Sequence, residues 1–326
     1  MTNGSNPMFL ITFLKRIKSF IWNSSLFKYF DNQKNIGLGT IYMLHRCDNF
    51  DFSKLTPNEN LKIPPDKLEE FLLNLQKESD IISLDELYDR LQSGLKSKKQ
   101  FSVITFDDGY KDNLYNALPV FEKLQVPFAV YVTDSFPECT ANLWWFVIED
   151  LICSHDILET SDGDIYSCLT TEEKSKTFYA LRRKILSIKS DSFAEEFASL
   201  FNKYPISMEN TVKSVGLTWD EVKQLDKSNY CTIGCHTYNH LNLASLSDEK
   251  MMDEIATSKK HIEEILGHPV YHFAYPYGSK NEVSSRVIKN TSSFNFKTAV
   301  LSYGGAVKTV SLKNKMKLPR RMFGLL

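Results

Sequence analysis

The chain has 326 residues and a formal net charge of -1, so it lacks the basic excess typical of proteins that neutralise nucleic-acid phosphates. Hydrophobic residues make up 42% of the sequence, enough for a sizeable core in one large domain or two smaller ones. The six cysteines form no C-x-x-C pair, which favours a reducing compartment over a disulfide framework. We therefore expect a globular protein without a nucleic-acid partner.

Residues 1–36 precede the first predicted strand and form the predicted N-terminal helical segment. Between residues 8 and 30, apolar side chains recur at helical spacing and basic residues interrupt them, which predicts an amphipathic helix. The uncharged apolar run is far too short to span a bilayer, and no signal-peptide pattern surrounds it. Two interpretations stay open: the helix lies in a membrane interface, or it packs on the domain's own surface. We expect a cytoplasmic protein, with peripheral contact at the inner membrane under the first interpretation.

From residue 37 onward, strand and helix patterns alternate. Strand patterns occur at residues 37–45, 81–82, 100–108 and 126–133. Helix patterns between them occur at residues 64–75, 83–91 and 113–124, the last one started or kinked near Pro119. Such alternation predicts parallel strands that are connected by helical crossovers.

Residues 143–215 break this alternation with a long, charged helical pattern. We predict a helical insertion here, inside a single barrel domain that spans residues 37–326. Beyond it, helix patterns at 216–225 and 248–266 alternate with strand patterns at 231–235 and 270–274, and shorter apolar runs follow at 297–301 and 306–310. Ser247 is the predicted cap of the longer helix, and Gly267 its predicted end.

Two adjacent acids, Asp107 and Asp108, end the strand pattern at 100–108 and are followed by Gly109. The carboxyl ends of parallel strands are where α/β folds place their chemistry. Neighbouring side chains of a strand point to opposite sides, so the two carboxylates need not share one function. One can hold a cation while the other acts as a base. The alternative is an Asp-Gly turn that closes a hairpin.

A histidine pair, His236 and His240, follows the strand pattern at 231–235. Residues four apart lie on one side of a helical turn, so both imidazoles can face one cation. Two imidazoles and one carboxylate suit Zn²⁺. The alternative is a coincidental surface pair.

A third motif, Pro276-Tyr277-Gly278, follows the strand pattern at 270–274. Pro fixes the turn, Gly allows close approach of the backbone, and a free backbone N–H here could stabilise an oxyanion. By itself, this motif is more simply explained as a structural turn.

Together, the Thr-Phe-Asp-Asp-Gly run, the His-Thr-x-x-His pair and the Pro-Tyr-Gly turn resemble the first three motifs of the polysaccharide deacetylases (NodB-homology, carbohydrate esterase family 4). Their order and spacing also fit, over roughly residues 38–323 apart from the insertion. The resemblance implies a distorted (β/α)7-type, NodB-like barrel. It also implies hydrolysis of N-acetyl groups on the amino sugars of a polysaccharide or a lipid-linked glycan precursor.

Carried over residue by residue, the resemblance assigns a role to each motif. Asp108, His236 and His240 would hold a divalent metal, expected to be Zn²⁺. Asp107 would be the general base, and the Tyr277 backbone N–H would stabilise the oxyanion. The partner of the protein would then be a glycan or a lipid-linked sugar.

The sequence departs from the family pattern at two catalytic positions. Apolar residues occupy the region where the third motif usually carries an Arg that orients the base, and either Arg320 or Arg321 is our candidate replacement. The late Leu-x-His motif that supplies the general acid is missing, because no histidine follows His272. His45, at the end of the first strand, is the candidate acid, and a core or hydrogen-bonding histidine is the alternative.

Two further interpretations of these residues stay open. The motifs do not indicate which acyl group the enzyme removes, so the protein could be a deformylase or an O-deacetylase of a lipid-linked sugar. Because the usual acid and Arg are missing, a carbohydrate-binding protein that has lost catalysis is the alternative from another class.

Overall fold

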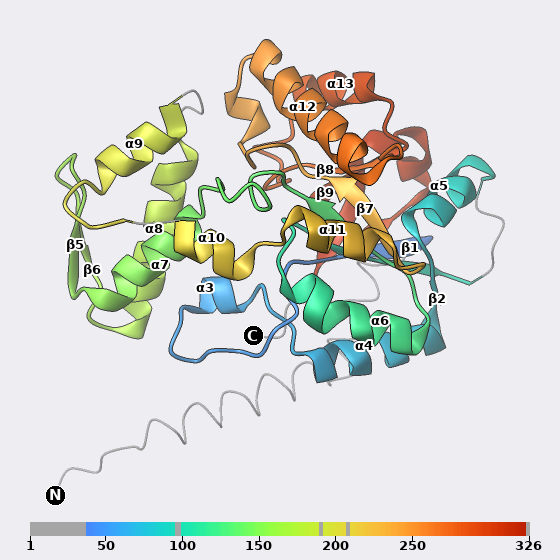
Figure 1. The fold of residues 1–326 in the computed structure, drawn as a ribbon, viewed down its shortest axis with the longest axis horizontal. Coiled ribbons are helices and arrows are strands. Elements are labelled where there is room, and N and C mark those ends of the chain that lie inside the picture. Colours follow the sequence, from blue (N-terminus) through green and yellow to red (C-terminus); the bar gives the residue numbers. More distant parts are fainter. Residues whose placement is uncertain (1–36, 95–98, 189–191, 207–208, 324–326) are drawn as a thin grey trace, which may run out of the picture.

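The computed structural model describes residues 37–94, 99–188, 192–206 and 209–323. Its centre is a closed barrel of parallel strands, each at least three residues long (Figure 1). In chain order these strands are β1 (Gly39–Leu44), β3 (Phe101–Phe106), β4 (Phe128–Val132), β7 (Cys231–Cys235), β8 (His272–Ala274), β9 (Thr298–Gly304) and β11 (Leu318–Met322). β1 pairs in parallel with both β3 and β11, which closes the barrel. The predicted (β/α)7-type barrel is therefore confirmed.

Three strands of the barrel, β3, β4 and β8, are buried along their whole length. Strands that are covered on both faces have near-continuous apolar sequences, and this is the pattern from which they were predicted. Two short strands extend the barrel sheet: β2 (Asp80–Ile81) runs parallel to β3, and β10 (Ala306–Val307) runs antiparallel to β1. At the start of β1, a Cβ on Gly39 would lie 2.4 Å from the Phe101 carbonyl oxygen, so only glycine fits this close pairing.

Helices surround the barrel and pack their apolar faces on the strands (Figure 1). They are α4 (Pro65–Glu78), α5 (Leu84–Gln92), α6 (Leu118–Leu124), α11 (Trp219–Asp226), α12 (Asp248–Leu266) and α13 (Ser285–Thr291). α12 has the predicted bounds, because Ser247 accepts a hydrogen bond from the Lys250 N–H and Gly267 ends the helix at a φ of 78°. α13 was not predicted.

The helix predicted at residues 113–124 is divided in two. A π-helical turn, Asn113–Ala117, leads into α6, and Pro119 lies in the first turn of α6. Pro119 has no N–H to donate to the preceding turn, so the hydrogen-bond pattern changes from π-helical to α-helical near this residue.

A second group of elements lies beside the barrel, at the left of Figure 1. It consists of α7 (Trp144–Ser154), a hairpin of β5 (Ile157–Glu159) and β6 (Ile165–Ser167), α8 (Thr171–Leu186), α9 (Phe193–Leu200) and α10 (Glu209–Val215). α7, the hairpin, α8 and α9 enclose a hydrophobic core of their own, and Tyr277 from the barrel packs against it. Val212 of α10 belongs to a separate cluster. The hairpin was not predicted, because its strands are only three residues long and mostly exposed.

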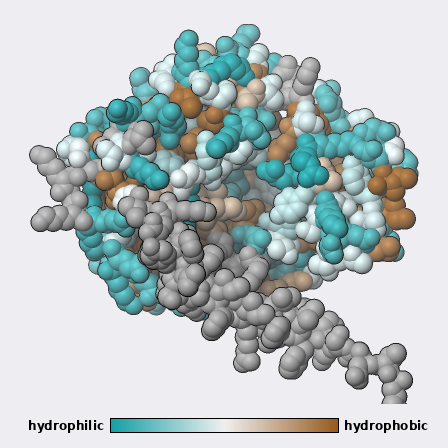
Figure 2. Space-filling model, turned by 180° about the vertical axis from the view of Figure 1, so that it is seen from behind, coloured by the Kyte–Doolittle hydropathy of each residue, from teal (hydrophilic) through white to brown (hydrophobic). Residues whose placement is uncertain are grey.

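The N-terminal amphipathic helix predicted within residues 1–36 lies outside the described residues. Among the residues that are described, no helix is both long and apolar enough to cross a membrane. Figure 2 shows the molecule from behind, and hydrophilic and apolar side chains are interspersed over this face.

Candidate active site

Three side chains from two distant segments converge at the carboxyl ends of β3 and β7. Asp108 Oδ1 lies 3.3 Å from His240 Nε2 and 3.5 Å from His236 Nε2. One donor atom from each of the three residues lies within 4.8 Å of the other two. This spacing brings one oxygen and two nitrogens around a single point, as a shared cation requires.

The ligand atoms of Asp108 and His236 have lone pairs that are free to bind a cation. Asp108 Oδ1 is buried and has no hydrogen-bond partner among the described residues. His236 Nδ1 lies 2.8 Å from the Ala274 carbonyl oxygen, to which it can only donate, so its Nε2 carries the lone pair that faces Asp108. Burial lowers the pKa of His236 to about 4, which keeps this imidazole neutral. One carboxylate oxygen and two imidazole nitrogens therefore fit a divalent cation such as Zn²⁺.

The two histidines meet by a different geometry from the predicted helical turn, so that expectation is wrong. His236 follows β7 directly, and residues 237–240 form a loop in which Thr237 and His240 have φ angles of 67° and 56°. Hydrogen bonds from the segment after β4 hold this loop: Thr133 Oγ1 donates to the His236 carbonyl, and the Ser135 N–H donates to the Tyr238 carbonyl. The imidazole centroids are 5.0 Å apart.

Asp107, which precedes Asp108 in the chain, pairs with Arg320. Nη1 and Nη2 of Arg320 donate to its two carboxylate oxygens over 2.7 and 2.6 Å, and the two residues are only 3% and 1% exposed. Arg320 is itself fixed, because its Nε donates to the Leu301 carbonyl and Nη1 also donates to Thr105 Oγ1. Burial alone would raise the pKa of Asp107, but the charge and hydrogen bonds of Arg320, together with the nearby His236 and His45, outweigh burial, and the pKa lies below its ordinary value. The base candidate is thus ionised and held in place.

Both acids line the same cleft although they are adjacent in the chain. Asp108 has a φ of 77°, a left-handed conformation that non-glycine residues rarely adopt. This kink turns Asp108 toward the histidines while Asp107 continues toward β11. The two carboxylates therefore have different partners, as expected, but share one cavity. Of the two arginines proposed from the sequence, Arg320 is the one that the structure brings to Asp107.

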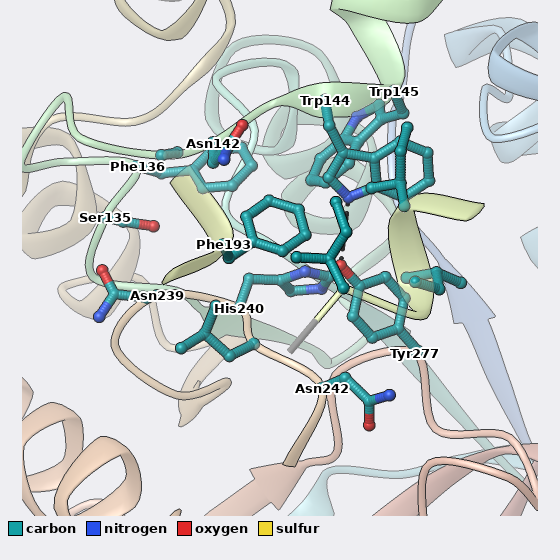
Figure 3. A pocket seen from close by; sticks show the side chains of 15 residues that line it. Ser135, Phe136, Asn142, Trp144, Trp145, Phe193, Asn239, His240, Asn242 and Tyr277 are labelled. Atoms are coloured by element: carbon teal, nitrogen blue, oxygen red, sulfur yellow. Dashed lines mark hydrogen bonds between the residues drawn. The ribbon is translucent and has the colours of Figure 1, made fainter. Parts of the chain in front are cut away.

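The Pro-Tyr-Gly turn brings Tyr277 beside the histidines. The rings of Tyr277 and His240 are 4.8 Å apart, and Trp144 Nε1 donates to the Tyr277 hydroxyl over 3.2 Å (Figure 3). The hydrogen bonds of the described residues include none from the Tyr277 backbone N–H. A Cβ on Gly278 would lie 2.7 Å from the Ser302 nitrogen, so the turn needs glycine at that position. The free N–H remains available to an oxyanion.

His45, the remaining candidate, follows β1 and lines the same cleft as Asp107 and Asp108. Its side chain is half-buried, and its backbone carbonyl accepts a hydrogen bond from Asn113 Nδ2 over 3.0 Å. The imidazole is close enough to the acids to contribute to the lowering of both their pKa values. All the candidate site residues except Arg320 thus line one cleft, and Arg320 contacts it through Asp107.

This cavity is a cleft of about 420 Å³ whose wall comes from outside the barrel. The barrel supplies the charged floor, and α7 and α8 supply a largely aromatic wall of Trp144, Trp145, Phe178, Tyr179 and Arg182. On another side of His240, Phe193 of α9 lines a smaller cavity of about 20 Å³ (Figure 3). The sequence analysis missed these wall residues. The Trp144-Trp145 pair was the available signal, but no pattern indicated that the insertion folds over the mouth of the barrel.

Comparison with known proteins agrees with this fold and with the sequence motifs. A family model described as polysaccharide deacetylase matches residues 94–297. The deacetylase PplD of Streptococcus pyogenes, solved in complex with acetate, is similar in fold, with a TM-score of 0.58 and 17% identity over 88% of this chain and 92% of that one. IcaB from Ammonifex degensii gives a TM-score of 0.54 and 14% identity over 87% and 91% of the two chains. No curated protein sequence matches.

Proposed function

The chain belongs to the polysaccharide deacetylase family, and from this premise we propose that it is a metal-dependent hydrolase that removes N-acetyl groups from amino sugars. The proposed substrate is a polysaccharide or a lipid-linked glycan precursor. The observation that carries the proposal is the convergence of Asp108, His236 and His240 beside an Asp107 that is paired with Arg320. Asp107, Asp108, His236 and His240 lie at the floor of one open cleft.

Each group at the floor has a chemical task in such a reaction. Asp108, His236 and His240 would hold a divalent cation, which when bound would lower the pKa of a water and polarise the acetyl carbonyl. Asp107, kept ionised by Arg320, accepts the proton of the attacking water. The backbone N–H of Tyr277 donates to the oxygen on which negative charge develops. His45 returns a proton to the departing amine, so that acetate and a free amino sugar leave.

Metal removal tests this proposal, and the products released in the same assay identify the acyl group. Dialysis against a chelator is expected to lower acetate release from N-acetylglucosamine oligosaccharides and lipid-linked sugars by at least about 10²-fold, and added Zn²⁺ is expected to restore it. Measuring formate and acetate in parallel separates deformylation from deacetylation. Full activity of the chelated, metal-free protein would contradict the proposal.

Two histidine variants test whether the metal acts at the proposed site. His240→Ala is expected to stay inactive when Zn²⁺ is added back. His268→Ala is the matched control, because His268 is an exposed histidine that pairs with Asp226 and does not line the cleft. It is expected to respond to Zn²⁺ as the unmodified protein does.

The role of His45 predicts a dependence on the leaving group. His45→Ala is expected to lower kcat for N-acetyl sugars by about 10²-fold, because an amine leaves poorly without a proton. Hydrolysis of an activated aryl acetate needs no such proton, so its kcat is expected to fall much less. Steady-state kinetics with both substrates provide the measurement. Equal losses on the two substrates would contradict the acid role.

We further propose that the substrate is met at the inner face of the membrane. The support is the basic, amphipathic pattern of residues 8–30, which suits a helix lying in a membrane interface. Fractionation of cells that express the native protein tests the proposal. Recovery of the protein outside the cytoplasmic membrane would contradict it.

A further inference from the structure

The wall of the cleft carries a cation without a partner, Arg182 of α8. It is half-buried, and neither a hydrogen bond nor an ion pair is found for its guanidinium in the part of the chain that the structure describes. Nearby cations differ in this respect: Arg46 pairs with Asp112, and Lys184 pairs with Asp162 and Asp164. An unpaired guanidinium that is partly removed from water retains unused hydrogen-bonding capacity.

The packing of α8 directs Arg182 into the cleft. Phe178, Leu181 and Ile185 of α8 are buried in the core of the insertion. Phe178 also reaches the cleft, and Tyr179 and Arg182, which are three residues apart and hence neighbours on the helix surface, line it beside Phe178. Arg183, the next residue, is exposed and does not line the cleft. The helix thus presents one of two adjacent arginines to the cavity.

Arg182 lines the same cleft as the metal-binding residues Asp108, His236 and His240. Tyr277 lines this cleft as well, and it packs against the hydrophobic core to which α8 contributes. The ring of Tyr277 is 4.8 Å from the ring of His240. Because one cleft holds both, a substrate with its acetyl group at the metal site has Arg182 in the wall beside it.

The charges of the cleft leave Arg182 uncompensated. Asp107 is neutralised by Arg320, and Asp108 faces the site of the proposed cation. Arg182 is the only Arg or Lys among the described residues that line this cleft. A metal-loaded cleft would consequently attract a negatively charged group at the α8 wall.

We propose that Arg182 binds an anionic group of the substrate, a phosphate or a carboxylate, next to the sugar that is deacetylated. The proposal rests on the proposed function, because it takes the acetyl group to lie at the metal site. The planar fork of a guanidinium donates two parallel hydrogen bonds to either kind of anion. A neutral substrate would leave this group unpaired, so the cleft discriminates in favour of charged glycans.

The test uses three N-acetylglucosamine oligosaccharides that are identical except for one substituent, which is neutral, a carboxylate or a phosphate. The unmodified protein is expected to prefer at least one charged substrate by roughly tenfold in kcat/KM, mainly through a lower KM. Arg182→Gln is expected to abolish this preference. Arg183→Gln, the matched control, is expected to retain it. The preferred substituent shows whether a phosphate or a carboxylate is recognised.

Two results would overturn the proposal: equal kcat/KM values for all three substrates with the unmodified protein, or a preference that survives in Arg182→Gln. Failure of the proposed function is a separate result, seen as no acetate release from any of the three. In that event, calorimetric binding of the same oligosaccharides to the unmodified protein and to Arg182→Gln still decides whether Arg182 binds the anion.

Discussion

Asp107→Asn is expected to lower kcat for acetate release by about 10³-fold while the protein keeps its metal. The amide has nearly the shape of the carboxylate but cannot accept a proton from water. The metal is expected to stay because Asp107 is not one of the residues whose donor atoms converge on one point. Those residues are Asp108, His236 and His240. Kinetics and metal analysis of the same preparation provide the measurement.

Asp108→Asn is the matched comparison, since it makes the same chemical change one residue away. We expect this variant to lose both activity and bound metal, because Asp108 Oδ1 lies 3.3 and 3.5 Å from the two histidine nitrogens. The assignment of the two acids would be contradicted if Asp107→Asn lost its metal, or if it kept activity within about tenfold of the unmodified protein.

Arg320→Ala is expected to lower the free energy of unfolding by about 3–5 kcal/mol, because it leaves the buried carboxylate of Asp107 without its cation. We also expect kcat to fall by about 10²-fold with little change in KM, since Arg320 positions the base and the described structure does not place it in the wall of the cleft. Denaturant unfolding and steady-state kinetics measure the two effects.

Two further variants separate the charge of Arg320 from its geometry. Arg320→Lys is expected to recover part of the stability but little of the activity, because an ammonium group cannot reproduce the two parallel hydrogen bonds. Arg321→Ala, on the next position of the same strand, is expected to retain kcat. A large loss of kcat in Arg321→Ala, with none in Arg320→Ala, would reverse the assignment.

The barrel could be predicted from the sequence because its strands and helices have local signatures. Buried parallel strands have continuous apolar runs, and α12 has both a Ser cap and a terminating Gly. The carboxyl ends of such strands meet at one edge, so the motifs that follow β3 and β7 could be expected to converge. The predicted metal-binding residues do so in the structure.

Features set by tertiary contacts were beyond the sequence. The loop that brings His240 beside His236 depends on hydrogen bonds from residues about a hundred positions earlier in the chain, such as Thr133 to the His236 carbonyl. The choice between Arg320 and Arg321 depends on which side of β11 faces the barrel interior. Arg182 lines the cleft only because the insertion packs beside the barrel, and no local pattern encodes that placement.

The central claim is that Asp108, His236 and His240 bind one divalent cation. Anomalous diffraction at the zinc edge, from crystals of the zinc-loaded protein, tests it most directly. We expect a single strong peak within bonding distance of Asp108 Oδ1, His236 Nε2 and His240 Nε2. No peak at this position in a protein that still releases acetate, or a peak bound by other residues of the cleft, would contradict the claim.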